Sequence, residues 1–193
     1  FVDKVLDGLS APPQYFPINV MMNKGINREI DEIIQTGTKG LSVAEFKNQA
    51  ENGALMLDVR TQKDFVAGHI PNAIFIGLNG GFAPWVGALI KDIHQPIILI
   101  TPEGKEEEAV TRLSRIGYDN SIGYLTGGID AWVNAGNEID TIDTIEASEL
   151  QEKLAKEELN VLDVRKDGEY DSDHLTIATH SSLDKINEEF EKL

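Results

Sequence analysis

The sequence reads Ala54-Leu55-Met56-Leu57-Asp58-Val59-Arg60, and 105 positions later it reads Leu159-Asn160-Val161-Leu162-Asp163-Val164-Arg165. The same offset pairs His69-Ile70 with His174-Leu175. Solenoid proteins repeat at roughly 20 to 50 residues. An offset of 105 therefore predicts two copies of one domain and excludes a repeat array.

Short, fully apolar runs alternate with helical patterns in the first copy. The runs 54–59 and 97–100 are typical of strands that a parallel sheet buries on both faces. Ser42 and Glu45 form a capping-box pattern for a helix over 43–51. This alternation predicts an α/β fold with a central parallel sheet flanked by helices. The other expected elements are strands over 73–76 and 122–125 and helices over 62–67, 85–90, 106–116 and 128–135.

We expect the first copy to span residues 39–138 and the second to begin at 145, after a polar linker over 136–144. By the offset, residues 145–193 are the N-terminal half of a domain, without counterparts for anything beyond Ala88. Half of a parallel-sheet domain leaves apolar faces open, so further chain or another partner must cover them. The chain begins with Phe1, which indicates a piece of a longer protein.

Three motifs together resemble a rhodanese domain. Its opening is similar to Leu57-Asp58-Val59-Arg60 and Gly68-His69-Ile70-Pro71-Asn72-Ala73, and its close is similar to Leu125-Thr126-Gly127-Gly128-Ile129-Asp130-Ala131-Trp132. The second copy resembles the opening only, with Asp173 in place of the Gly and Thr176 in place of the Pro.

The resemblance implies a catalytic loop after the strand 97–100, with the family pattern Cys-x-x-Gly-x-Arg. A cysteine thiolate there takes up sulfane sulfur as a persulfide, which loop N–H groups and a helix N-terminus stabilise. This sequence has Thr101-Pro102-Glu103-Gly104-Lys105-Glu106 instead. Thr101 stands at the Cys position, Gly104 is retained, and Glu106 stands at the Arg position. No cysteine occurs anywhere in the 193 residues.

Each departure from the pattern disfavours sulfur transfer. The Thr101 hydroxyl cannot carry a persulfide and ionises only with the help of a base. Pro102 removes one backbone N–H. Acidic residues at 103 and 106–108 place negative charge at the loop, although acids also stabilise a helix N-terminus. We therefore expect no catalytic residue in this chain and a degenerate active loop over 101–106.

The remaining polar and aromatic residues are expected to be structural. Asp58 and Arg60 indicate an ion pair at a strand end, and His69 and His174 lack the neighbouring ligands that a metal site needs. We predict no metal or cofactor site in this chain. His94 is expected on a surface loop, and Trp85 and Trp132 in packing.

The first forty residues suggest an upstream neighbour. Residues 1–38 include a Pro-rich stretch over 9–20 and a helical pattern over 24–35 that could dock on the first copy. This tail resembles the one that joins a metallo-β-lactamase-fold domain to rhodanese domains in bacterial fusion proteins, which include persulfide dioxygenases. The resemblance implies iron bound by His and Asp in that upstream domain, and none of those ligands lies in this chain.

Composition limits the partners. The chain has 33 acidic residues against 17 Lys and Arg, for a net charge of −16. Such a charge repels phosphate backbones, which disfavours nucleic acids and anionic membranes. No apolar stretch reaches the roughly 18 residues of a membrane span, and residues 1–5 do not begin a signal peptide. We expect a cytoplasmic protein, and a homo-oligomer is compatible with the sequence.

Two functions compete on this reading. The first is a catalytically inactive rhodanese-like scaffold in a sulfide- or persulfide-metabolising protein, of the metallo-β-lactamase-family hydrolase or persulfide dioxygenase–sulfurtransferase type. The second is part of an active thiosulfate or persulfide sulfurtransferase, whose Cys would fall near position 206, 13 residues beyond Leu193. A third and weaker hypothesis is phosphate or arsenate chemistry, because some phosphatases share this fold, but they need the same Cys.

Overall fold

The computed structural model describes residues 30–156 and 159–189. The Pro-rich stretch over 9–20 and the first part of the helix expected over 24–35 lie outside these ranges. The first described element is α3 (Ile30–Gly37). It packs against the first copy, with Ile33 buried in the core and Gly37 next to Val110. A methyl group on Gly37 would lie 2.7 Å from Val110, so this close approach requires glycine.

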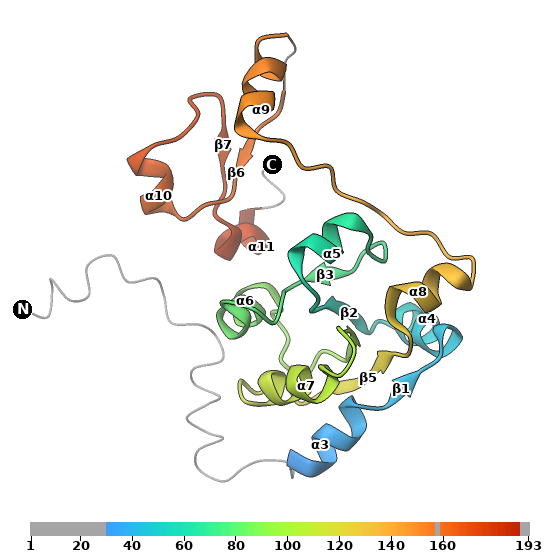
Figure 1. Cartoon of the computed structure of the whole chain (residues 1–193). Coiled ribbons are helices and arrows are strands. Elements are labelled where there is room, and N and C mark those ends of the chain that lie inside the picture. The colour runs from blue at the N-terminus through green and yellow to red at the C-terminus, as the bar shows by residue number, and fades with distance from the viewer. Residues whose placement is uncertain (1–29, 157–158, 190–193) are drawn as a thin grey trace, which may run out of the picture.

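The first copy is built on a five-stranded sheet in the order β1-β5-β4-β2-β3, and every neighbouring pair in it is parallel. The predicted α/β class with a central parallel sheet is confirmed (Figure 1). The strands are β1 (Gly40–Leu41), β2 (Leu55–Asp58), β3 (Ile74–Phe75), β4 (Ile97–Ile100) and β5 (Ser121–Leu125).

Helices cover both faces of this sheet (Figure 1). After α3 they are α4 (Val43–Glu51), α5 (Gln62–Ala67), α6 (Phe82–Leu89), α7 (Glu106–Ser114) and α8 (Gly128–Asn134).

The central strand β4 divides the core into two clusters. Its four residues are fully buried, and successive side chains of a strand point to opposite faces. Ile97 and Leu99 pack in a cluster that includes residues of α3, α6 and α7. Ile98 and Ile100 pack in a second cluster with residues of α4 and α8. All four residues of β4 are apolar because helices bury the side chains on both faces of this strand.

Local signals placed some helix ends better than others. Ser42 and Glu45 form the predicted capping box at the start of α4. In contrast, α6 begins at Phe82 and not at Trp85, so the expected start was three residues late. Pro84 lies in the first turn of α6, where a missing N–H costs no intrahelical bond.

The linker expected over 136–144 is attached to the first copy over much of its length. His69 and Asp140 exchange two backbone hydrogen bonds of 2.9 Å, and the Ile142 N–H donates to the Val66 carbonyl at 3.0 Å. The indole N–H of Trp132 donates to the Glu138 carbonyl at 2.7 Å. Polar composition here marks a segment that lies on the surface, and its backbone is fixed by hydrogen bonds.

The second copy repeats the order of the first. A helix is followed by a strand, a short helix and a second parallel strand that pairs with the first. Its elements are α9 (Ala147–Leu154), β6 (Leu162–Asp163), α10 (Asp167–Ser172), β7 (Thr179–His180), the 3-10 helix η1 (Leu183–Lys185) and α11 (Ile186–Glu189).

An aspartate–arginine clamp occurs in both copies with the same geometry. Arg60 donates to both Asp58 carboxylate oxygens and to the Gly68 carbonyl, with Nη2 at 2.7 Å from Asp58 and 2.8 Å from Gly68. Arg165 makes the corresponding bonds to Asp163 and to the Asp173 carbonyl, at 2.6 and 2.9 Å. The clamp ties the end of a strand to the loop that precedes the next one. The pair of Asp58 and Arg60 is the ion pair that the sequence predicted.

The two copies differ sharply in burial. Leu57, Val59 and Ile70 are 0%, 1% and 1% exposed in the first copy. The residues 105 positions later, Leu162, Val164 and Leu175, are 44%, 41% and 44% exposed. In the first copy β2 lies between β3 and β4, whereas among residues 30–156 and 159–189 β6 pairs with β7 alone. The second copy therefore has uncovered apolar side chains where the first has its core.

No helix among the described residues is both long enough and apolar enough to cross a membrane.

The first prediction uses the two clamps as a matched pair. Replacing Arg60 by Ala leaves the fully buried Asp58 carboxylate without its partner, which should cost about 3 kcal/mol of unfolding free energy. Arg165→Ala removes the same bonds at a half-exposed site. Both tryptophans, Trp85 and Trp132, lie in the first copy, so tryptophan fluorescence in urea reports on that copy. The midpoint should fall for Arg60→Ala and stay unchanged for Arg165→Ala; equal midpoints for both would contradict this assignment.

The second prediction concerns acid. Hydrogen bonds from the Arg165 side chain and backbone lower the pKa of Asp163 from 3.8 to about 2. A lowered pKa means that the clamp stabilises the second copy fully above about pH 4, and that this contribution is lost as the pH falls through about 2. An NMR titration of the Asp163 carboxyl group should show a midpoint near 2, and Arg165→Ala should return it toward 3.8. A midpoint near 3.8 with Arg165 in place would refute the clamp in solution.

Candidate functional site

The loop 101–106 lies where parallel sheets usually place their chemistry. It follows β4, the central strand, and leads into α7. Ligands of open α/β folds bind beyond the carboxyl ends of the strands. The loop that the sequence aligned with a catalytic loop therefore occupies the expected position in the fold.

The loop folds around one carboxylate. Thr101 Oγ1 donates to Glu106 Oε1 at 3.2 Å, and the Gly104 backbone N–H donates to the same oxygen at 3.2 Å. Gly104 has φ of +76°, a left-handed conformation that glycine adopts without strain. The Lys105 N–H donates to the Pro102 carbonyl at 3.1 Å and closes the turn. The loop thus brings Thr101, Gly104 and Glu106 together. The hydrogen-bond acceptor at its centre is the Glu106 carboxylate, a side chain of the loop, and not a bound anion.

The Thr101 hydroxyl has no strong base to activate it. Thr101 is only 8% exposed, and the Glu106 carboxylate that accepts its hydroxyl hydrogen is a weak base for an alcohol. Asp58 ends the neighbouring strand, but its carboxylate accepts from the backbone N–H and the guanidinium of Arg60. A hydroxyl group cannot hold sulfane sulfur as a persulfide, so Thr101 offers no sulfur acceptor.

Two cationic side chains, Lys105 before α7 and Arg112 in its last turn, pair with one carboxylate. Lys105 Nζ lies 2.8 Å from Glu108, and Arg112 Nη2 lies 2.6 Å from the other oxygen of the same carboxylate. The hydrogen bond from Lys105, with a smaller contribution from Arg112, lowers the pKa of Glu108. Arg112 also donates to the Leu78 carbonyl at 2.7 Å. These cations stabilise the helix start and its neighbouring loop.

The two repeated histidines have the structural role expected of them. His69 Nδ1 lies 3.0 Å from the Phe65 carbonyl, and its ring stacks on Phe65 with centroids 4.0 Å apart. His174 does the same with Tyr170, at 2.7 Å and 3.8 Å. A carbonyl only accepts, so Nδ1 carries the hydrogen in both rings. His94 is exposed, as the sequence predicted.

Metal chemistry has no visible basis in the part of the chain that the structure describes. Within residues 30–156 and 159–189 no three His, Asp or Glu side chains gather closely enough to hold an ion. The Asp and His residues that recur in both copies are committed to the clamps and to the stacked pairs described above.

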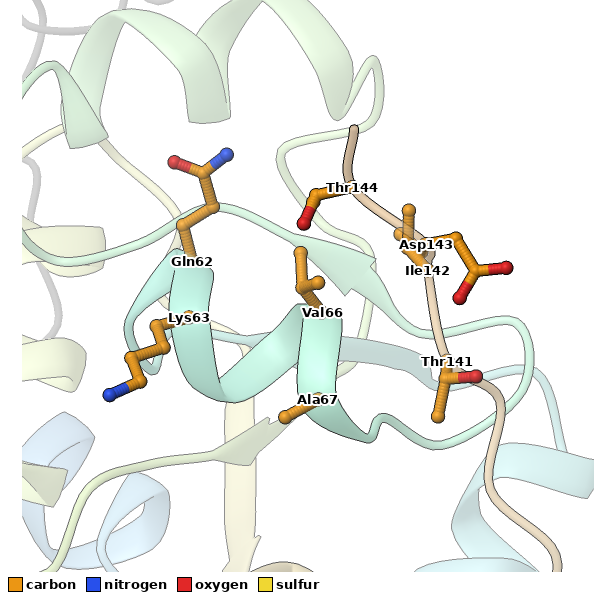
Figure 2. Close-up of a pocket in the computed structure, with 8 residues that line it drawn as sticks. All are labelled: Gln62, Lys63, Val66, Ala67, Thr141, Ile142, Asp143 and Thr144. Atoms are coloured by element: carbon orange, nitrogen blue, oxygen red, sulfur yellow. The ribbon is translucent and has the colours of Figure 1, made fainter. Parts of the chain in front are cut away.

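A shallow pocket lies between α5 and the linker. Figure 2 shows the linker running beside the helix, with Lys63 and Asp143 pointing away from each other. No residue of the loop 101–106 lines this pocket, so it is not part of the candidate site. Its lining residues are Gln62, Lys63, Val66, Ala67, Thr141, Ile142, Asp143 and Thr144.

Sequence reasoning missed the orientation of Glu106. The alignment placed it at the Arg position and treated it as negative charge at the mouth of the loop. In the structure its carboxylate turns inward and accepts from Thr101 and Gly104. The sequence of the loop contains a signal for this orientation. A carboxylate two residues after a turn glycine, as Glu106 is after Gly104, can accept from that glycine's N–H.

The first copy is similar to known rhodanese-like domains in sequence and in fold. The family model for the rhodanese-like domain matches residues 42–135. A rhodanese-like domain from Anabaena sp. is 19% identical, with a TM-score of 0.46, and the match covers 56% of this chain and 89% of that one. A thiosulfate sulfurtransferase from Pseudomonas aeruginosa is 17% identical, with a TM-score of 0.46 and coverage of 84% and 38%.

A metallo-β-lactamase from Staphylococcus aureus is 26% identical, with a TM-score of 0.49 and coverage of 64% of this chain and 33% of that one. A comparison with curated proteins returned no match. The matched residues include strands β2 to β5, the loop 101–106 and the motifs that bracket them. Residues 42–135 are therefore similar to the rhodanese-like domain family.

Proposed function

We propose that this chain is a catalytically inactive rhodanese-like scaffold module of a multidomain protein that metabolises sulfide or persulfides. The observation that carries the proposal is the loop after β4. It presents the Thr101 hydroxyl where sulfur transfer needs a thiolate, and the whole chain contains no cysteine. Without a thiolate there is no nucleophile and no persulfide intermediate.

The inward carboxylate supports the same conclusion. An amide nest binds an anion because several N–H dipoles point at one place. Here the Gly104 N–H is already bonded to Glu106, and Pro102 has no N–H to offer. An incoming thiosulfate would have to displace a covalently attached anion and would meet negative charge. The degenerate loop 101–106 is thus unsuited to sulfur transfer for two reasons: it lacks a thiolate nucleophile, and its negative charge repels an anionic sulfur donor.

The proposed scaffold role rests on the position of the degenerate domain between two other domains of the proposed longer protein. We assign residues 1–38 to the tail of an upstream metallo-β-lactamase-fold domain, 39–138 to the degenerate domain and 145–193 to the first half of a second copy. The tail's resemblance to persulfide dioxygenase fusions supports the upstream assignment. Iron in such a domain would use ligands outside this chain, so no step of that chemistry involves the residues described here.

One observation favours a second candidate, an active thiosulfate or persulfide sulfurtransferase. The second copy repeats the strand pair and the Asp163–Arg165 clamp, and its Leu162 and Val164 lie exposed where a complete copy would cover them. A completed second copy would carry its own loop near position 206. This candidate requires a cysteine there, and a parent sequence without one would reject it.

The third prediction tests the inactive loop directly. The chain, incubated with thiosulfate and cyanide, should form thiocyanate no faster than buffer, because Thr101 cannot accept sulfur. Any rate above the buffer blank that scales with protein concentration would overturn the proposal.

A gain-of-function pair serves as the control for this assay. Thr101→Cys with Glu106→Arg restores the family pattern Cys-x-x-Gly-x-Arg and removes the carboxylate. We expect measurable thiocyanate formation from this variant. Thr101→Ser with Glu106→Arg has the same charges but no thiol, and it should stay at the blank. If the Ser variant were as active as the Cys variant, the activity would not arise from the loop thiol.

The fourth prediction tests the inward carboxylate. Glu106→Ala removes the acceptor for Thr101 and Gly104 and should lower the unfolding free energy by about 1 kcal/mol more than Glu107→Ala. Both residues lie in the first turn of α7, so the interaction with the helix dipole is lost equally in the two variants. Urea unfolding followed by tryptophan fluorescence gives the difference. Equal destabilisation would mean that the Glu106 side chain faces solvent.

A further inference from the structure

The two copies meet at the C-terminal end of α6. The Asn187 side-chain amide, in α11, donates to the Leu89 carbonyl at 3.0 Å and to the Ala88 carbonyl at 3.3 Å. In the opposite direction, Lys91 Nζ donates to the Asn187 carbonyl at 3.3 Å. Figure 1 shows α11 lying next to α6, and η1 also contacts α6.

The end of α6 needs donors from outside the helix. The last four carbonyls of any helix have no intrahelical N–H partner. Many helices end on a left-handed glycine that satisfies some of them, but α6 ends on Ile90, with φ of −101° and ψ of 102°. Its last turn also contains no basic residue. Asn187 supplies two N–H groups on one side chain, which suits two adjacent carbonyls.

The repeat shows that Asn187 departs from its counterpart in the first copy. Asn187 lies 105 residues after Phe82, which starts α6 and is 2% exposed in the core. At the equivalent position of the second copy, the exposed side-chain amide of Asn187 donates to a carbonyl of the first copy. Within the described part of the second copy, the buried residues are Ser181 and Ser182, directly before η1.

We propose that the C-terminal end of α6 is the surface by which the degenerate first copy holds the second copy in a fixed orientation, with Asn187 capping the helix and Lys91 completing the contact. This inference deepens the proposed scaffold function, on which it rests, by naming the docking site and its partner. The hydrogen bonds from Asn187 and Lys91 have fixed directions, so we assign them the role of setting the orientation of the second copy.

Spin labels can measure this orientation in the full 193-residue chain. Because the chain has no cysteine, Glu51→Cys in α4 and Asp171→Cys in α10 provide two unique and exposed labelling sites. Double electron–electron resonance then gives the distribution of distances between the copies. We expect a narrow distribution in the parent, and a distribution at least twice as wide when Asn187→Ala and Lys91→Ala are added together.

A matched control separates the interface from general surface effects. Asn160→Ala with Lys63→Ala changes the same residue types at exposed positions for which no bond between the copies is seen. This control should keep the parent's width, and each single interface variant should give an intermediate width. A broad distribution in the parent, or equal widths for the interface and control variants, would overturn the proposal.

The thiocyanate assay keeps the two proposals apart. Activity in the parent chain with a narrow distance distribution would refute catalytic inactivity and leave the docking site standing. A blank assay with a broad distribution in the parent would refute the docking site alone.

Discussion

The first copy depends on the burial of β4 from both sides. Its four apolar residues are fully buried between β2 and β5, with Ile97 and Leu99 in one cluster and Ile98 and Ile100 in the other. Because no polar side chain is tolerated on either face, the first position able to carry chemistry is the residue after the strand. That residue is Thr101, and the fold fixes its position whether or not it can react.

This constraint makes the shape of the domain independent of the residues in the loop after β4. The sheet, the clamp between Asp58 and Arg60 and the stacked pair of Phe65 and His69 do not involve the loop. The loop has its own stabilisation, in which Glu106 accepts from Thr101 and Gly104. The internal carboxylate of Glu106 therefore holds the turn without a bound ligand.

The sequence predicted most of what local or periodic interactions determine. The capping box at Ser42, the bounds of β4 and the ion pair of Asp58 and Arg60 were predicted correctly, because each depends on residues close in sequence or on strand burial. The start of α6 was placed late because Gly81 gives no side-chain cap and Pro84 resembles a helix stop. The inward turn of Glu106 and the reach of Asn187 to Leu89 depend on backbone positions set by tertiary packing. The spacing of Gly104 and Glu106 permits the inward bond without requiring it, and no spacing in the sequence encodes the contact of Asn187 with Leu89.

The unpaired edge of β6 has a consequence for handling the isolated chain. A strand edge flanked by exposed Leu162, Val164 and Leu175 is a template for pairing with another molecule. At high concentration such edges favour edge-to-edge association, and the net charge of −16 opposes it by mutual repulsion that salt screens. Aggregation of this chain should therefore increase with ionic strength. Association that depends on surface ion pairs would instead decrease as salt screens the attraction.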